Sequence, residues 1–199
     1  MHTSTESQGT FAKRLCSTVL LMLTLAISVG VQAKKVGGFN IPDTLDLNGL
    51  PLVLNGAGVR TKVVIKVYVG ALYLAESSND AAEIISADEP MAIRLQVRSG
   101  FLNRKKMQAA LLDGFKKSTG GNTAPIQSEI DQMMDLMSDS IKKKDVYLLA
   151  YSPDQGTVLS KNGSEVGSIA GLAFKQALFG IWLSDSPAQA SLKKAMLGQ

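Results

Sequence analysis

The chain has 199 residues, of which 45% are hydrophobic, with 21 Lys+Arg against 17 Asp+Glu, one His and one Cys. This length fits one domain with an appendage, and this composition excludes a disordered, collagenous or disulfide-rich protein. The net charge of +4 is mild and no block of about five or six like charges occurs, so we expect no nucleic-acid partner.

Residues 1–33 are typical of a secretory signal peptide. Lys13 and Arg14 precede an apolar run over residues 15–31, and small residues stand at positions −3 and −1 of a cleavage site after Ala33. The run is about 17 residues long and is diluted by serine and threonine, whereas a membrane-spanning helix needs about 20. Cleavage is therefore favoured over a membrane anchor, and we expect a periplasmic or secreted protein without a stable membrane span.

Cleavage removes His2 and Cys16, the only histidine and cysteine of the chain. The predicted domain, residues 34–199, keeps 19 Lys+Arg and 16 Asp+Glu, a charge of about +3. A chain without cysteine can enter an oxidising compartment without mispaired disulfides. Any chemistry must then use arginine, lysine, tyrosine and carboxylates, so we expect no metal and no cofactor.

The first part of this domain predicts strands. Asn48-Gly49 lies between two apolar segments and favours a hairpin, because both residues of a type I′ turn need a positive φ. Alternating side chains predict one long strand from Thr61 to Ala75 and another from Met91 to Arg98. Between them we expect a short helix that begins at Asn79 or Asp80 and ends at Ser86.

Two amphipathic helices are predicted in the middle of the chain. The first runs from Asn103, its cap, to Lys117, and the second from Ile126 to Ile141. The methionine and isoleucine stripe of the second helix is interpreted as core, although flexible thioethers can also line an apolar pocket. The three lysines at positions 142–144 are interpreted as a solvated helix end, favoured by the helix dipole.

The last part of the chain predicts both strands and helices. The expected elements are strands over residues 146–151, 156–160 and 165–169 and helices over residues 170–183 and 187–197. Asn162-Gly163 marks a second type I′ turn, and Ser186 and Pro187 suit the cap and first turn of the final helix. This order predicts an α+β fold, in which helices cover one side of a mainly antiparallel sheet.

The chain lacks the P-loop, GxGxxG, HExxH, GxSxG and CxxC patterns, and Gly56-Ala57-Gly58 has neither the spacing nor the following helix of a phosphate loop. Arg60 follows these glycines, and its guanidinium could bind a carboxylate or phenolate in bidentate geometry. The alternative is an ordinary surface arginine. Tyr68 has the same parity, but eight residues of regular strand separate the two by about 26 Å. They meet only if the chain bends back or a hairpin lies between them.

Arg94, Gln96 and Arg98 share one face of the strand over residues 91–98. The arginines could line a cavity for an anionic ligand, and Arg98 is a candidate ligand-binding residue on this ground. The alternative is a solvated face, since antiparallel sheets often expose one side to water.

Two parts of the sequence resemble the chalcone isomerase superfamily. One is Leu54–Arg60 with Ile65–Leu74, and the other is Phe174–Leu183 with Ser186-Pro187. The chain looks most like the bacterial chalcone-isomerase-like branch, whose members carry signal peptides. The resemblance implies an open-faced β-sandwich, in which helices cover one face of a large antiparallel sheet, with a ligand cleft between the layers and no cofactor.

The resemblance matches Arg60 to the arginine that holds the attacking oxyanion in chalcone isomerases. The other catalytic positions differ, because the threonine of the long strand falls at Tyr68. The helix tyrosine and asparagine fall near Leu102 and Ala109, and the hydroxyl residue of the penultimate helix falls at Gly180. The plant fatty-acid-binding branch holds a carboxylate with an arginine and a tyrosine, and Arg60 and Tyr68 resemble that pair.

Three functions follow as hypotheses. The first is an exported, non-catalytic protein that binds a fatty acid or other amphipathic carboxylate through Arg60, Tyr68 and Arg98, with the Met/Ile face of residues 126–141 around the tail. The alternative is a cofactor-independent isomerase or intramolecular lyase of the chalcone-to-flavanone type, in which Arg60 stabilises the oxyanion of a phenolic substrate. The third is a structural or partner-binding periplasmic protein without a small ligand.

Overall fold

The structure, a computed structural model, describes His2 and residues 33–199. The predicted signal segment therefore lies outside the described residues, apart from His2 and Ala33. Among the helices of the described part, none has the length and apolar character needed to span a membrane.

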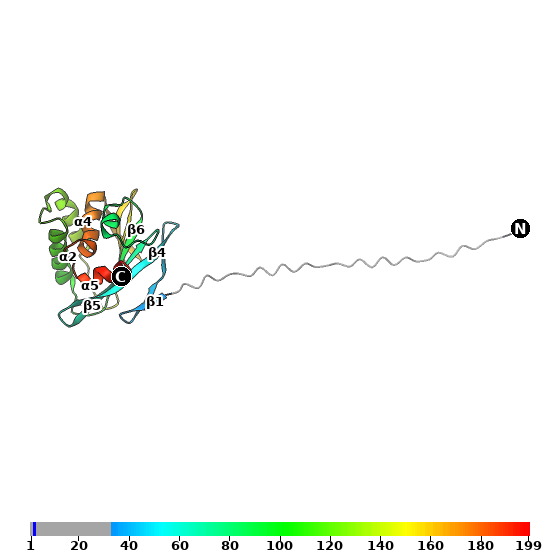
Figure 1. Cartoon of the computed structure of the whole chain (residues 1–199), viewed down its shortest axis with the longest axis horizontal. Helices are drawn as coiled ribbons and strands as arrows, with labels where there is room; N and C mark the ends of the chain where they lie inside the picture. Colours follow the sequence, from blue (N-terminus) through cyan, green and yellow to red (C-terminus); the bar gives the residue numbers. More distant parts are fainter. Residues whose placement is uncertain (1, 3–32) are drawn as a thin grey trace. The chain divides into compact units, whose positions relative to one another are not determined.

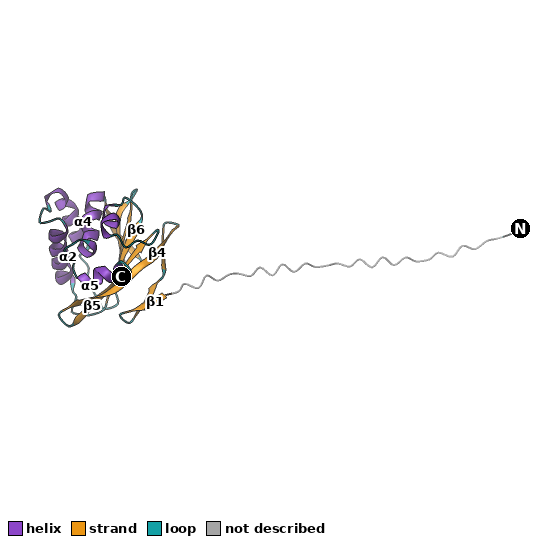
Figure 2. Ribbon diagram, in the orientation of Figure 1, coloured by secondary structure: helices purple, strands orange, loops and turns teal. Residues whose placement is uncertain are grey.

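A seven-stranded antiparallel sheet forms the centre of the fold (Figures 1 and 2). Its strands follow one another in chain order: β3 (Thr44–Leu47), β4 (Leu50–Lys62), β5 (Ile65–Leu74), β6 (Met91–Val97), β7 (Val146–Ser152), β8 (Gly156–Lys161) and β9 (Ser164–Ile169). A separate hairpin is made of β1 (Ala33–Val36) and β2 (Phe39–Pro42). Each strand pairs with its sequence neighbour, and short turns join all of these pairs except β5–β6 and β6–β7, whose connections contain helices.

Helices cover one face of this sheet, and the β1–β2 hairpin lies on the other side (Figure 2). They are α1 (Ala81–Ser86), α2 (Arg104–Ser118), α3 (Gln127–Leu136), α4 (Leu172–Leu183) and α5 (Ala190–Met196), with a short 3-10 turn at Ala124–Ile126. The architecture confirms the predicted α+β fold, an open-faced β-sandwich in which helices cover one face of an antiparallel sheet.

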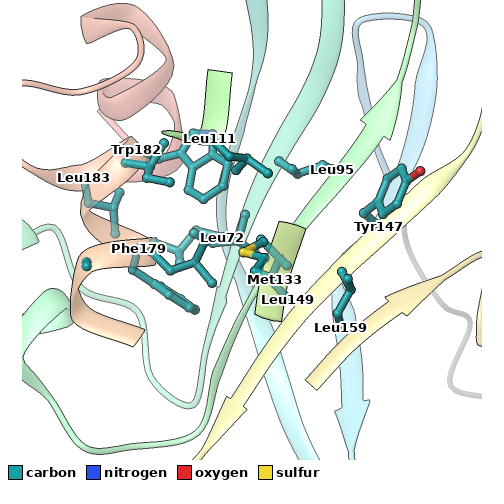
Figure 3. Packing of buried hydrophobic residues seen from close by; sticks show 14 of the residues in the cluster. Leu72, Leu95, Leu111, Met133, Tyr147, Leu149, Leu159, Phe179, Trp182 and Leu183 are labelled. Carbon is teal, nitrogen blue, oxygen red and sulfur yellow. The ribbon is translucent and has the colours of Figure 1, made fainter. Parts of the chain in front are cut away.

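The main core lies between the sheet and the helices (Figure 3). Leu72, Leu95 and Leu149 come from neighbouring strands, and they meet Met133 and Phe179 of the helical layer. All five side chains are at most 2% exposed. This burial removes large apolar side chains from water, which stabilises the fold by about 1.5–3 kcal/mol for each fully buried one.

The turn and cap signals of the sequence are largely confirmed. Asn48 and Asn162 have φ of +54°, and each is followed by a glycine of positive φ in a tight hairpin. Asp80 caps α1 and Asn103 caps α2 through their side chains. These polar residues satisfy backbone groups that the adjoining element leaves without partners, which is why local sequence predicts them.

Three expectations were wrong. The strand predicted from Thr61 to Ala75 is interrupted, because Val63 and Val64 form a turn between β4 and β5. Helix α3 ends at Leu136, so the lysines at positions 142–144 lie in an irregular segment and not at a helix end. The last helix begins after Gln189, without the predicted Ser186 cap. The β1–β2 hairpin was not anticipated, although Gly37 and Gly38 mark its turn.

Gly56 and Gly58 bring the C-terminal helix against the sheet. A Cβ atom at Gly56 would lie 2.2 Å from the carbonyl oxygen of Ala195, and one at Gly58 would lie 2.7 Å from the Ala195 Cβ. Asn55 adds a hydrogen bond of 2.9 Å from its Nδ2 to the carbonyl oxygen of Met196. The glycine pair therefore serves close packing of β4 against α5, in agreement with the absence of a phosphate-loop pattern.

Lys175 is a buried cation with a structural role. Its Nζ donates to the carbonyl oxygens of Ile84, Ile85 and Ala87 at 2.8, 3.0 and 2.6 Å. Because the last carbonyl groups of a helix have no partner within the helix, the ammonium group completes α1 and ties it to α4. Burial lowers the pKa of Lys175 to about 8, so the group still carries its charge at neutral pH.

All four tyrosines are buried and resist ionisation. Burial raises the pKa of Tyr73, Tyr147 and Tyr151 to about 12, and it also raises the pKa of Tyr68. For Tyr151, the hydrogen bond that its hydroxyl donates to Asp88 raises the pKa further. An unfolded tyrosine ionises near pH 10, so between pH 10 and 12 the folded chain holds protons that the unfolded chain releases.

Alkaline pH is therefore expected to unfold the protein through its tyrosines. Their contribution to the free energy of unfolding is complete below about pH 10 and is lost as the pH rises toward about 12. We expect the ultraviolet absorbance of tyrosinate to stay low at pH 10 and then to rise together with the loss of circular dichroism. Full tyrosinate absorbance at pH 10 with an intact fold would contradict this expectation.

Candidate functional site

A pocket of about 360 Å³ lies between the sheet and the helical layer. Its walls come from the ends of β4 and β5, from α2 and the loop before it, and from the end of α4 and the segment after it. The lining residues are Arg60, Lys62, Val67, Tyr68, Phe101, Leu102, Lys106, Met107, Ala109, Ala110, Leu111, Asp113, Gly114, Lys117, Ile181, Trp182 and Ala188. This volume lies within the range of about 300–1,000 Å³ that is usual for small-molecule sites.

Arg60 and Tyr68 are brought together by the unexpected turn at Val63-Val64. They are direct partners in the antiparallel pairing of β4 with β5, and both line the pocket. Cross-strand partners have Cβ atoms only about 4.5–5.5 Å apart, in place of the roughly 26 Å of a continuous strand. A hairpin therefore lies between Arg60 and Tyr68, and the two side chains meet across it.

The guanidinium of Arg60 is held at one nitrogen and leaves two free. Its Nη1 donates to the Thr61 carbonyl oxygen at 2.8 Å and to Gln189 Oε1 at 3.0 Å. The same Gln189 oxygen accepts from the Thr61 backbone nitrogen at 2.8 Å, next to the irregular register after Arg60. The Nε and Nη2 groups take no part in these bonds, and the guanidinium lies close enough to the Tyr68 hydroxyl to lower its pKa, so an acceptor beside both side chains can be reached by these nitrogens.

Tyr68 has a free donor in the pocket. The side chain is 8% exposed, and its hydroxyl oxygen accepts a hydrogen bond of 2.9 Å from Trp182 Nε1. An indole nitrogen can only donate, so the hydroxyl hydrogen of Tyr68 must find another acceptor. Burial raises the pKa of Tyr68, while the Trp182 hydrogen bond and the charge of Arg60 lower it in part. Tyr68 is therefore a protonated donor at neutral pH.

Positive charge dominates the polar lining of the pocket. Besides Arg60, it carries Lys62, Lys106 and Lys117, and the acidic side chain among the lining residues is Asp113. Asp113 is engaged in a 2.6 Å ion pair with Lys117. Three cations therefore face the pocket without a carboxylate of their own in its lining, an arrangement that favours an anionic ligand.

Arg98 does not belong to this pocket. Its guanidinium lies beside the turn of the β1–β2 hairpin, where a Cβ atom at Gly38 would stand 3.0 Å from Arg98 Nη1. Strand parity places Arg94 on the same outer face, and its Nη2 donates to Gln96 at 3.0 Å. The pocket opens on the helix side of the sheet, so the structure separates Arg98 from Arg60 and Tyr68.

The methionine-rich helix also lies away from the pocket. Ile130 and Met133 of α3 are about 1% exposed and belong to the main core. The apolar wall of the pocket is supplied instead by α2, β5 and α4, through residues such as Met107, Val67 and Trp182. The expected tail-binding role of α3 was therefore wrong, and its interpretation as core is confirmed.

At the remaining positions of the chalcone isomerase pattern, the residues are apolar or packed too closely to carry a polar side chain. Leu102 and Ala109 both line the pocket, so the pocket has apolar walls there. Gly180 does not line it, and a Cβ atom at Gly180 would lie 2.9 Å from the Ser118 Cβ of α2. A hydroxyl residue at position 180 would push the two helices apart, so close packing explains its absence.

Two residues of the site were not singled out as site residues in the sequence. Trp182 orients the hydroxyl of Tyr68, and Gln189 fixes Arg60. Neither follows a local pattern, since each acts across more than a hundred residues of chain.

Groups of three or more histidine, cysteine or carboxylate side chains that could hold a metal ion are absent from the described residues. The arrangement therefore offers hydrogen-bond donors and positive charge above an apolar wall.

A curled antiparallel sheet, helices over one face and a pocket between the layers define the class of protein, the open-faced β-sandwich of chalcone isomerase type. The model of the chalcone isomerase-like family matches residues 33–198, so the chain belongs to this family. Among solved structures, it is similar to the crystal structure of a fatty-acid binding protein from Arabidopsis thaliana. The two share 20% identity with a TM-score of 0.64, over 80% of this chain and 92% of the other. No curated protein sequence matches the chain.

Proposed function

We propose that this protein is an exported, non-catalytic binding protein for a fatty acid or another amphipathic carboxylate. The observation that carries the proposal is the meeting of Arg60 and Tyr68 in one pocket with an apolar wall. In the proposed complex, the free nitrogens of Arg60 and the hydroxyl of Tyr68 donate to the carboxylate, and the tail lies along Val67, Met107 and Ile181. The fatty-acid binding named for the similar plant protein supports this ligand class.

Export is part of the same proposal. A signal peptide cleaved after Ala33, as in the bacterial branch of the family, would deliver residues 34–199 to the periplasm or the medium. Such cleavage would remove Ala33, and with it only the first pairing of the β1–β2 hairpin, that of Ala33 with Pro42. The three pairings that follow would remain. The N-terminal sequence of the protein recovered from the producing cells tests this point, with Lys34 as the expected first residue.

Chalcone-type catalysis is less well supported by the site. Arg60 could hold a phenolate oxygen, but the raised pKa of Tyr68 makes it a poor base at neutral pH. Leu102 and Ala109 supply no polar group, and Gly180 has no room for a hydroxyl residue. An assay with a panel of chalcones separates the two functions, since the proposal expects no turnover above the uncatalysed rate.

Native mass spectrometry of the protein purified from cells is the direct test of the proposal. We expect a fraction of the protein to carry a mass corresponding to a long-chain fatty acid, and the delipidated protein to take up palmitate in a calorimetric titration. Protein that is always free of ligand and shows no heat of binding with palmitate would overturn the proposal. Neutral lipids of equal chain length are the control, because they lack the carboxylate.

A further inference from the structure

The turn between β4 and β5 is apolar, exposed and strained. Val63 and Val64 are 91% and 85% exposed, and Val63 has a φ of +57°. A β-branched residue in this region is unfavourable by about 1–3 kcal/mol. The turns at Asn48-Gly49 and Asn162-Gly163 use residues that tolerate a positive φ. Two exposed valines at a turn that disfavours them are therefore better suited to a contact outside the chain than to folding.

Exposed cations on three neighbouring segments lie at the same end of the sheet as this turn. The loop after β6 lies against β5, because the Arg98 and Ser99 nitrogens donate to the Val67 carbonyl oxygen at 2.8 and 3.2 Å. The segment before β7 is held beside it, since the Lys144 nitrogen donates to the Val97 carbonyl oxygen at 2.8 Å. The exposed cations of these segments, called here the basic end, are Lys62, Lys66, Arg104, Lys105, Lys106, Lys142, Lys143 and Lys144.

Within residues 33–199, none of the cations of the basic end forms an ion pair. The first turn of α2 contains no acidic residue and begins with three cations, although the helix dipole favours anions there. Beside the third segment, Asp139 and Asp145 approach Lys161 at 3.6 and 3.8 Å, and among the basic end the charge of Lys142 also helps to lower the pKa of Asp145. Such an arrangement is unfavourable in the isolated protein and becomes favourable on an anionic surface.

We propose that the basic end and the Val63-Val64 turn dock on an anionic lipid membrane. Apolar side chains that enter the headgroup region and lysines above anionic lipids are the two elements of interfacial membrane binding, and each such cation contributes about 1 kcal/mol. Charge complementarity and the exposed apolar tip favour a lipid surface over a protein partner, for which an apolar patch wider than two side chains is expected.

Docking in this way would bring the pocket to the membrane. Lys62 and Lys106 belong to the basic end, and both line the pocket together with the 39% exposed Phe101. Lys106 lies 3.3 Å above the Phe101 ring, so the apolar and positive features meet at the pocket entrance. An amphipathic ligand could then pass between pocket and bilayer without crossing water. The docking itself goes beyond the proposed function and does not require a particular ligand.

Co-sedimentation with vesicles tests this proposal. The protein recovered from the producing cells and its variants, all with the same N-terminus, are compared on vesicles of phosphatidylcholine and on vesicles that also contain phosphatidylglycerol. The key variant is Val63→Gly with Val64→Ser, which installs a residue suited to the positive φ. The matched control is Leu50→Ser, a 39% exposed side chain at the opposite end of β4.

The proposal expects binding to the anionic vesicles only, weakened by high salt. The turn variant should lose about tenfold or more of this binding while its free energy of unfolding stays equal or rises, and Leu50→Ser should bind as the parent does. A second variant, Lys105→Glu with Lys143→Glu, should also lose binding without unfolding.

Equal binding to both vesicle types, or full binding by the turn variant, would overturn the proposal and favour a protein partner for this surface. Palmitate affinity measured in the absence of vesicles is expected to be unchanged in the turn variant, so the two proposals can fail independently.

Discussion

Replacing Arg60 by alanine is expected to weaken the binding of a long-chain fatty acid by about 2–5 kcal/mol, which is roughly thirty-fold or more in Kd. Arg60 is half-buried and has two free donor nitrogens beside the free hydroxyl of Tyr68. A carboxylate in the pocket would lose its bidentate partner and remain partly desolvated. The loss should appear in calorimetric titrations with palmitate, with little change in the thermal unfolding of the free protein.

Arg98→Ala is the matched control for this experiment. The same residue type is removed, but from the outer face of the sheet beside the β1–β2 turn. Its palmitate affinity should therefore equal that of the parent protein. If Arg98→Ala weakened binding as much as Arg60→Ala, the carboxylate would not lie in the pocket that Arg60 lines, and our account of the site would be wrong.

Replacing Gly56 by alanine is expected to destabilise the fold by about 3 kcal/mol or more. The new Cβ atom would lie 2.2 Å from the Ala195 carbonyl oxygen and 2.8 Å from that of Met196. Backbone atoms cannot rotate away as a side chain can, so α5 must move off the sheet. Leu192, which is 1% exposed, would then lose part of its packing. Denaturant unfolding monitored by circular dichroism measures the loss.

Gly100→Ala is the control for the glycine experiment. A Cβ atom at Gly100 has open space around it, and its backbone is not in the left-handed region. The substitution is expected to change the free energy of unfolding by no more than about 0.5 kcal/mol. Similar losses for Gly56→Ala and Gly100→Ala would show that the effect at Gly56 is not due to contact with α5.

The fold could be predicted from the sequence where interactions between residues close together in the chain decide the structure. Asn48 and Asn162 mark turns, and Asp80 and Asn103 begin helices, because a side chain or a backbone preference decides each of these features locally. The β4–β5 turn escaped prediction for the same reason. Val63 opposes the local preference for turns, and only the pairing of the flanking strands holds it at a positive φ.

The site could be predicted only in part. Arg60 and Tyr68 were singled out by residue type and by family resemblance, but their meeting depends on the β4–β5 turn. Arg98 shares the charge of Arg60 but lies on the other face of the sheet, and the sequence alone does not show which face the helices cover. Trp182 and Gln189 contact the pair from the C-terminal part of the chain, and no local pattern predicts contacts of that range.

One comparison tests most directly whether the pocket recognises a carboxylate through Arg60. Palmitate and the alcohol of equal chain length are titrated into the parent protein, Arg60→Ala and Arg98→Ala. We expect the parent and Arg98→Ala to prefer palmitate by about 2 kcal/mol or more, and Arg60→Ala to bind the two ligands almost equally. An undiminished preference for palmitate in Arg60→Ala would contradict the account, because the carboxylate would then be held by other residues.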